Sequence, residues 1–408
     1  MRQEPIKIAR HEVGLRRPCY IIFEVASTHE NNWKIAKKYV DQAKEVGADA
    51  LKFQLFEANK LLNSLTPGLK STYDYFKGAE TPRKWFPKLI ELCRKARIDL
   101  LCTPFDEDAA SFLNDTGVKA VKISSGDLTH HQLLAHVAKF KKPVILSTGM
   151  ATMDEVRAAV NVLRSHGCKQ LILLQCTSVY PMPYEDANVR AMRGLKKEFG
   201  CLVGYSDNGS KGIVVPLVAV AMGASVIEKH VTSQKQRGSL DDAFSLSLGE
   251  FSEMTKGIRQ LEKDYKGHLE EAAKDLAKEF GDDVEKVLGD GVKKPAGFGV
   301  KREDGTQMTE ADERHWARRG VYPNQNIKRG AKITEAMIIS LRPDVGVSAL
   351  SFHEIIGKKA EEDLSKRCPL KIDGDGVRVF KKADIRAMYT DPSEVDFVNV
   401  LLEYSYFD

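Results

Sequence analysis

Two lysines lie inside apolar stretches of this sequence, where a charged side chain needs a partner. Lys52 belongs to ALKFQLF (50–56) and Lys122 to AVKISS (120–125). Either lysine alone is compatible with an outward, solvated position. Together they indicate a site for a small anion, because hydroxyl groups that donate to phosphate or carboxylate oxygens end other apolar stretches. These hydroxyls belong to Thr103, Ser125, Ser147 and Ser206.

Two glutamates and a histidine also lie within or at the end of apolar stretches. Glu24 ends an apolar stretch, and Glu228 and His230 are two residues apart in another, so those two share one face of a strand. Three roles fit the two carboxylates: pairing with the lysines, orienting His230, or proton transfer. His230 fits a metal-binding or catalytic role, or a hydrogen-bonded position in the core.

The apolar stretches alternate with amphipathic segments. The segment 32–48 ends at Gly47 as a capped helix does, and the segment 152–167 begins at Thr152, a typical N-cap residue. This alternation predicts right-handed βαβ units and an α/β protein built as a (β/α)8 TIM barrel, with function at the carboxyl ends of its strands. A doubly wound sheet is the alternative, which the lack of G-x-G-x-x-G after the first strand disfavours. The predicted strands are 20–26, 50–56, 99–105, 120–125, 143–149, 171–178, 202–207 and 225–232.

After the eighth strand the sequence becomes highly charged and then rich in glycine and lysine. We predict a barrel domain over 1–260, a helical and Gly/Lys-rich linker over 261–312, and a small β-rich domain over 313–385. A tail over 386–408 includes a candidate strand, VDFVNVLLEY.

Composition excludes several classes of partner. The net charge is +5 and the charges are interspersed, so the sequence predicts no nucleic-acid partner. The sequence contains no run of about 18 apolar residues, so it predicts no membrane-spanning helix. The seven cysteines form no C-x-x-C motif, which is typical of buried thiols in a cytoplasmic protein.

Motifs spread over much of the chain resemble the sialic acid synthase family. The resemblance spans about residues 18 to 372, weakens in the linker and ends before the tail. The segment RRGVYPNQNIKRGAKITEAMIISLRPDVGVS resembles the C-terminal antifreeze-like (SAF) domain of that family. The motifs of the barrel are FEVASTHENNWKIAKKYVDQAKEVGADALKFQLF, CTPFDEDAASFL, AVKISSGDL, PVILSTGMATMDEV, YPMPYED, GYSD and EKHVT.

This resemblance implies a condensation of phosphoenolpyruvate with an open-chain amino sugar, N-acetylmannosamine or a modified relative. The products are a nonulosonic (sialic-type) acid and phosphate, released by cleavage of a C–O bond. A divalent metal, Mn²⁺ or Mg²⁺, polarises the sugar aldehyde in this family. The resemblance also implies a domain-swapped homodimer in which the SAF domain covers the partner's active site.

The resemblance assigns roles residue by residue. Glu24 and Gln54 match positions near the reacting carbons and the sugar, and His230 matches a metal ligand. Tyr180, Asp241, Trp316 and Arg342 match sugar contacts, the last two within the SAF domain. Positions that bind phosphoenolpyruvate are matched by Lys52, Thr103, Lys122, Ser125, Ser147 and Ser206, of which Lys122 is also expected to be catalytic.

Two positions depart from the family pattern. Asn208 stands where the family has a second histidine that binds the metal, and Ser178 stands at a substrate-binding position where an asparagine is usual. An amide oxygen is a harder and weaker ligand than imidazole, so we expect a metal requirement that is weaker or shifted toward Mg²⁺. Two other functions stay open: a non-catalytic protein that binds phosphoenolpyruvate or sugar, and a Schiff-base aldolase that uses Lys52 or Lys122.

Overall fold

The structure is a computed structural model that describes residues 4–66, 69–209, 212–233, 239–265, 269–297, 300–301 and 307–388. The chain divides into two compact units. The first comprises Met1–Leu55, Ala79–Leu128 and Leu133–Glu310. The second comprises Phe56–Gly78, Thr129–Gln132 and Ala311–Asp408.

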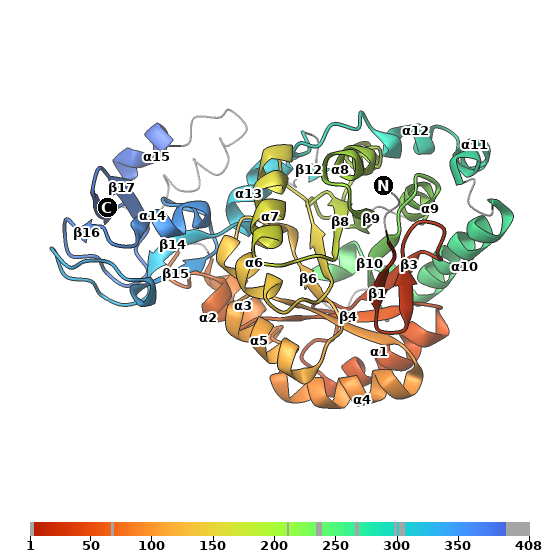
Figure 1. Cartoon of the computed structure of the whole chain (residues 1–408), viewed down its shortest axis with the longest axis horizontal. Coiled ribbons are helices and arrows are strands. Elements are labelled where there is room, and N and C mark those ends of the chain that lie inside the picture. The colour runs from red at the N-terminus through yellow and green to blue at the C-terminus, as the bar shows by residue number, and fades with distance from the viewer. Residues whose placement is uncertain are drawn as a thin grey trace. The chain divides into compact units, whose positions relative to one another are not determined.

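The first unit is a barrel of eight parallel strands with helices around it (Figure 1). The strands are hydrogen-bonded in the order β5-β4-β3-β10-β9-β8-β7-β6, and β5 and β6, at the two ends of this path, lie in contact. All eight predicted strands and the predicted fold class are therefore confirmed. The strands are β3 (Tyr20–Glu24), β4 (Ala50–Leu55), β5 (Asp99–Pro104), β6 (Val121–Ile123), β7 (Val144–Ser147), β8 (Leu171–Cys176), β9 (Leu202–Asp207) and β10 (Val226–Thr232).

Alternate residues of each strand serve two separate cores. Ile21, Phe23 and their equivalents pack outward against the helices, while Tyr20 and Ile22 belong to a smaller cluster drawn from seven of the strands and from Ala120, just before β6. An N-terminal hairpin, β1 (Ile6–Ile8) and β2 (His11–Val13), adds its apolar side chains to this smaller cluster. Because the first residues of the strands belong to it, the polar side chains are concentrated at the other end.

Local signals set the helix boundaries. The Asn32 side chain accepts a hydrogen bond at the start of α1 (Trp33–Glu45), and Gly47 follows its end with φ of 82°. Thr152 and Glu155 form a capping box on α7 (Met153–Ser165). The other barrel helices are α4 (Phe86–Ala96), α5 (Glu107–Thr116), α6 (His131–Ala138), α8 (Ala191–Phe199), α9 (Val214–Ala221) and α10 (Leu248–Tyr265).

The stretch 261–312, for which we predicted a linker, is largely part of the barrel unit. Helix α10 runs into it, and α11 (Leu269–Phe280) and α12 (Asp282–Leu288) follow. Leu276 and Val287 join the outer core of the barrel. The many charges of this stretch concealed an apolar face on each helix, and that face buries the segment.

The second unit holds the predicted β-rich domain. Its core includes Val321, Ile333 and Leu370. Segment 56–78, with α2 (Ala58–Leu61) and α3 (Lys70–Gly78), joins this unit, and Asn63 N donates to Arg342 O at 2.8 Å. The candidate strand in the tail lies outside the described residues. The other elements are α13 (Glu310–Ala317), whose first residue belongs to the barrel unit, β14 (Gly320–Pro323), β15 (Ile338–Leu341), α14 (Phe352–Ile355), β16 (Lys359–Ala360), β17 (Leu370–Asp373), β18 (Gly376–Val379) and α15 (Lys382–Met388).

None of the helices among the described residues is long and apolar enough to span a membrane.

Candidate functional site

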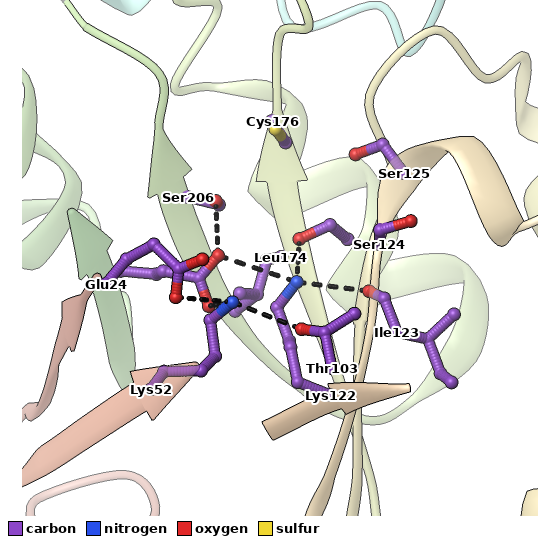
Figure 2. A network of polar contacts seen from close by, with 12 residues as sticks. Glu24, Lys52, Thr103, Lys122, Ile123, Ser124, Ser125, Leu174, Cys176 and Ser206 are labelled. Atoms are coloured by element: carbon purple, nitrogen blue, oxygen red, sulfur yellow. Dashed lines mark hydrogen bonds and ion pairs between the residues drawn. The ribbon is translucent and has the colours of Figure 1, made fainter. Parts of the chain in front are cut away.

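Lys52 and Lys122, in the middle of β4 and β6, point into the barrel with their ammonium groups turned toward each other (Figure 2). Lys52 Nζ lies 2.6 Å from Glu24 Oε2 and 3.7 Å from Glu228 Oε2. It also donates to Thr103 Oγ1 at 3.1 Å. The side chains of Lys52 and Glu24 are 3% and 0% exposed, so this ion pair is shielded from water.

Lys122 reaches the same carboxylate from the opposite side. Its Nζ donates to Ser147 Oγ at 2.8 Å and to Ile123 O at 3.0 Å, and lies 3.5 Å from Glu228 Oε1. Ser206 Oγ donates to the same Glu228 oxygen at 3.0 Å. Of the three roles left open for the two glutamates, the structure shows pairing with the lysines, and Glu228 bridges them.

The four charges influence one another strongly. Burial raises the pKa of Glu24, and Lys52 only partly opposes this effect. Burial alone would also raise the pKa of Glu228, but Lys122 and Lys52 together outweigh it and lower that pKa. Burial lowers the pKa of Lys122, whereas Glu228 and Glu24 overcome burial at Lys52 and raise its pKa. Glu24 therefore holds a proton more readily than Glu228. This difference suits Glu24 as a proton donor and Glu228 as a carboxylate that stays ionised.

Two further hydroxyls lie at the ends of neighbouring strands. Ser125 Oγ accepts a hydrogen bond from Gly149 N at 3.0 Å, just beyond β7. Ser178 Oγ, beyond β8, is buried and has no hydrogen-bond partner among the described residues. A Cβ atom on Gly149 would lie 2.8 Å from Ser125 Oγ and 2.3 Å from Ser178 Oγ, so only glycine permits this close approach.

His230 and Asn208 lie at the ends of β10 and β9. His230 is 8% exposed, and its Nδ1 has no hydrogen-bond partner among the described residues. Burial lowers the pKa of His230 to about 4, so the imidazole is neutral near pH 7. Asn208 Nδ2 donates to Thr177 O at 2.9 Å and to Tyr180 Oη at 3.2 Å, and none of the described residues donates to its Oδ1.

The residues expected to contact the sugar gather around these groups. Gln54 Nε2 donates to Glu24 Oε1 at 2.8 Å. The Tyr180 ring, 39% exposed, lies 4.8 Å from the Phe244 ring, which in turn lies 5.0 Å from the His230 ring. Asp241 accepts hydrogen bonds from the backbone N and the hydroxyl of Ser27. An exposed aromatic ring beside fixed carboxylate and amide groups suits a polyhydroxylated ligand.

Trp316 and Arg342 belong to the second unit, so their expected contact with the sugar stays a prediction. Glu310 was not among the predicted site residues. Its carboxylate accepts hydrogen bonds from backbone N–H groups beyond β7 and β8. Glu310 lies in a charged helical segment far along the chain from the barrel strands. No periodicity or short motif distinguishes it from the acidic residues around it.

Comparison with known proteins gives this geometry a context. Residues 39–270 match the model of the NeuB family, and residues 318–374 match that of the SAF domain. An uncharacterized protein of Methanocaldococcus jannaschii, MJ1065, is 38% identical over 88% of this chain and 95% of its own length. The N,N'-diacetyllegionaminic acid synthase of Legionella pneumophila is 34% identical over 86% of this chain and 93% of its own.

A solved structure agrees with these matches. The crystal structure of the spore coat polysaccharide biosynthesis protein SpsE of Bacillus subtilis superimposes with a TM-score of 0.71 and 29% identity. The similarity covers 89% of this chain and 96% of that one, so it includes the barrel and the domain that follows. With its family match covering more than half of its length, this chain belongs to the NeuB family and carries a C-terminal SAF domain.

Proposed function

We propose that this protein condenses phosphoenolpyruvate with the open-chain form of an N-acylated amino sugar to give a nonulosonic acid and phosphate. The observation that carries the proposal is the pair of buried lysines, Lys52 and Lys122, that share Glu228 and are surrounded by hydroxyl groups. Buried ammonium groups with hydroxyl neighbours form a preorganised site for an anion, and they need no reorganisation when the anion arrives. The name of the Legionella relative supports the same class of product.

The residues divide the chemistry among them. Lys52, Lys122, Ser147 and Ser206 hold the phosphate and carboxylate of phosphoenolpyruvate, so that C3 of the enol faces the sugar aldehyde. A C–C bond forms between C3 and the aldehyde carbon, and the aldehyde oxygen takes up a proton. Water then adds to C2, and the C–O bond to phosphate breaks. Glu24 is the proposed proton carrier, because burial raises its pKa and Gln54 fixes its orientation.

His230 and Asn208 fit a weakly held divalent cation. The unpartnered Nδ1 of His230 is neutral near pH 7, and the amide of Asn208 is oriented so that Oδ1 remains available. One imidazole nitrogen and one amide oxygen suit Mn²⁺ or Mg²⁺ but hold either more loosely than two imidazoles would hold Mn²⁺. When bound, such an ion polarises the aldehyde for attack.

Assembly and compartment complete the proposal. We propose a domain-swapped homodimer, in which Trp316 and Arg342 complete the partner's site. Mixed dimers of Lys122→Ala and Arg342→Ala chains test it: recovered activity supports the swap, and unrecovered activity in proven mixed dimers contradicts it. We also propose that the protein works in the cytoplasm, because all seven cysteines are free thiols.

The decisive experiment measures phosphate release from phosphoenolpyruvate with a panel of aldoses, beginning with N-acetylmannosamine. Each sugar is tested with Mn²⁺, with Mg²⁺ and with a chelator. Release that depends on one sugar supports the proposal and identifies the acceptor. Binding of phosphoenolpyruvate without release under any condition contradicts it and favours a binding protein.

A Schiff-base aldolase is the second candidate, because the lowered pKa of Lys122 is typical of lysines that attack carbonyl groups. Borohydride in the presence of pyruvate would trap a covalent adduct on Lys122 if this candidate were right. We expect no adduct, since Lys122 Nζ already donates hydrogen bonds to Ser147 and to Ile123 O.

A further inference from the structure

Glu310 is a buried carboxylate bonded to the ends of two barrel strands. It is the last residue of the barrel unit and is 1% exposed. Its Oε1 accepts hydrogen bonds from Met150 N at 2.7 Å and from Ser178 N at 2.5 Å. Its Oε2 accepts one from Ala296 N at 2.7 Å. Three backbone N–H groups from three separate segments therefore converge on one side chain.

Two of the three segments hydrogen-bonded to Glu310 carry site hydroxyls. Met150 lies three residues after Ser147, and Ser178 is itself one of those hydroxyls. Gly149, between Ser147 and Met150, donates through its N–H to Ser125 Oγ. A single hydrogen-bonded path thus runs from Glu310 through the end of β7 to Ser125.

The backbone at this point needs an external restraint. Met150 has φ of 59°, a left-handed conformation that costs free energy for a residue with a long side chain. Such a conformation persists only where the surroundings fix it. The hydrogen bond from Met150 N to Glu310 is one such restraint, and a carboxylate is a stronger acceptor than a neutral oxygen.

The segment 291–296, which donates Ala296 N to Glu310, is also anchored to the barrel by hydrogen bonds of its own. Asn188 Nδ2 donates to Val292 O, and Asn188 Oδ1 accepts from Gly291 N, both at 2.9 Å. Between these anchors and Ala296 lies Lys293, which is 6% exposed. Burial is the main influence on the pKa of Cys176 and raises it, while Lys293 is among the groups that lower it. The segment therefore brings a further positive charge toward the end of β8.

We propose that Glu310 is a positioning residue for the phosphoenolpyruvate site. It holds the ends of β7 and β8 so that the hydroxyls of Ser125, Ser147 and Ser178 converge on the anion. The identity of that anion rests on the proposed function. The role of Glu310 rests on the contacts given above and on the fact that both its oxygens are used.

Two variants and one control test this role. Glu310→Gln keeps the volume but retains one acceptor oxygen, so at least one of the three N–H groups loses its partner; Glu310→Ala removes both acceptors. Glu285→Gln is the control, because Glu285 lies in the same part of the chain with a 73% exposed side chain in a surface ion pair. Calorimetry measures phosphoenolpyruvate binding to each full-length protein, and phosphate release gives KM for each substrate.

We expect phosphoenolpyruvate to bind about tenfold more weakly to Glu310→Gln and about 100-fold more weakly to Glu310→Ala, because small misplacements at a site are costly. The KM for the sugar and the behaviour of Glu285→Gln should stay as in the wild type. In the double variant Glu310→Gln/Ser125→Ala, the loss of phosphoenolpyruvate affinity should be smaller than the sum of the losses in the two single variants, because both changes act on the same hydroxyl. Circular dichroism at the assay temperature confirms that each variant is folded.

The outcomes separate this inference from the proposed function. If the wild type binds phosphoenolpyruvate and folded Glu310→Gln binds it equally or more tightly, the positioning role is overturned while the proposed function stands. Tighter binding would mean that Glu310 competes with the anion for the N–H groups. If the wild type itself does not bind phosphoenolpyruvate, the proposed function fails. In that case, unchanged near-ultraviolet circular dichroism in both Glu310 variants would overturn the positioning role as well.

Discussion

The two ends of the barrel both contain networks of charged side chains, yet they are built differently. At the amino ends of the strands, Asp99 accepts hydrogen bonds from Tyr20 Oη at 3.0 Å and His11 Nδ1 at 2.8 Å. Asp49 accepts from Ile21 N at 2.9 Å and Arg259 Nη2 at 2.7 Å. The side chains of Asp99, Tyr20, His11, Asp49 and Arg259 have no buried polar atom that lacks a hydrogen-bond partner among the described residues.

The carboxyl ends are incomplete by the same measure. Ser178 Oγ and His230 Nδ1 are buried without hydrogen-bond partners among the residues that the structure describes. The pKa of Lys122 is lowered, which means that its charge is only partly compensated. A polar network that is fully satisfied stabilises the fold, whereas one with open donors and acceptors is prepared for a ligand. The carboxyl end thus has the features expected of a binding site, and the amino end those of a stabilising network.

The strongest test of this contrast is Lys122→Ala. Removing the ammonium should lower the rate of phosphate release by at least about 10³-fold, because it deletes fixed charge in a shielded site. The midpoint of thermal unfolding should change little, since Glu228 keeps its contacts with Lys52 and Ser206. Wild-type rates in this variant would contradict the assignment of the anion site.

Acid should destabilise the protein through buried histidines at the carboxyl end. Burial lowers the pKa of His29 and of His230 to about 4. Below pH 6.5 the unfolded chain protonates these imidazoles while the folded chain does not, so the free energy of unfolding falls as the pH decreases from 6.5 to 4. Each histidine accounts for up to about 3 kcal/mol of this loss.

Urea titrations across this pH range measure the effect, and His29→Gln separates one contribution. His29 contacts Thr81 at 2.8 Å and lies outside the anion site. The variant should show a shallower decline between pH 6.5 and 4. An unchanged slope would mean that His29 is not buried in its neutral form.

Asp99→Ala should give the opposite result to Lys122→Ala. It leaves the buried Tyr20 hydroxyl without its acceptor, so the free energy of unfolding should fall by about 2 kcal/mol. Phosphate release per folded molecule should be unchanged, because this network lies at the other end of the strands. Denaturant unfolding and the release assay measure the two effects. If Asp99→Ala greatly slowed phosphate release but left the free energy of unfolding unchanged, the two ends would not have the separate roles described here.

The smallest effect concerns the metal. Asn208→His should bind Mn²⁺ about tenfold more tightly than the wild type in calorimetry without substrates, because imidazole replaces an amide oxygen. Asn208→Ala is the matched variant that removes the ligand, and it should bind more weakly than the wild type. Equal Mn²⁺ affinity in all three proteins would show that residue 208 does not contact the metal.

Much of the barrel was predictable because its signals are local. The apolar stretches predicted all eight strands, Thr152 and Gly47 marked helix ends, and Lys52 and Lys122 pointed to a buried cluster of charged side chains. We predicted that residues 261–312 include helix, but not that α11 and α12 pack on the barrel, because charged residues dominate this stretch and the apolar face of each helix is narrow. The grouping of segment 56–78 with the second unit likewise has no local signal.

The sequence by itself determined which side chains stand at the carboxyl ends of the strands, because strand and helix periodicities depend on near neighbours in the chain. The tertiary structure alone decided how these side chains meet. Glu228 bridges two lysines from β4 and β6 only because the strands close into a barrel. Glu310 reaches Met150 and Ser178 across 160 and 132 residues, and contacts over such separations depend on packing that no short motif encodes.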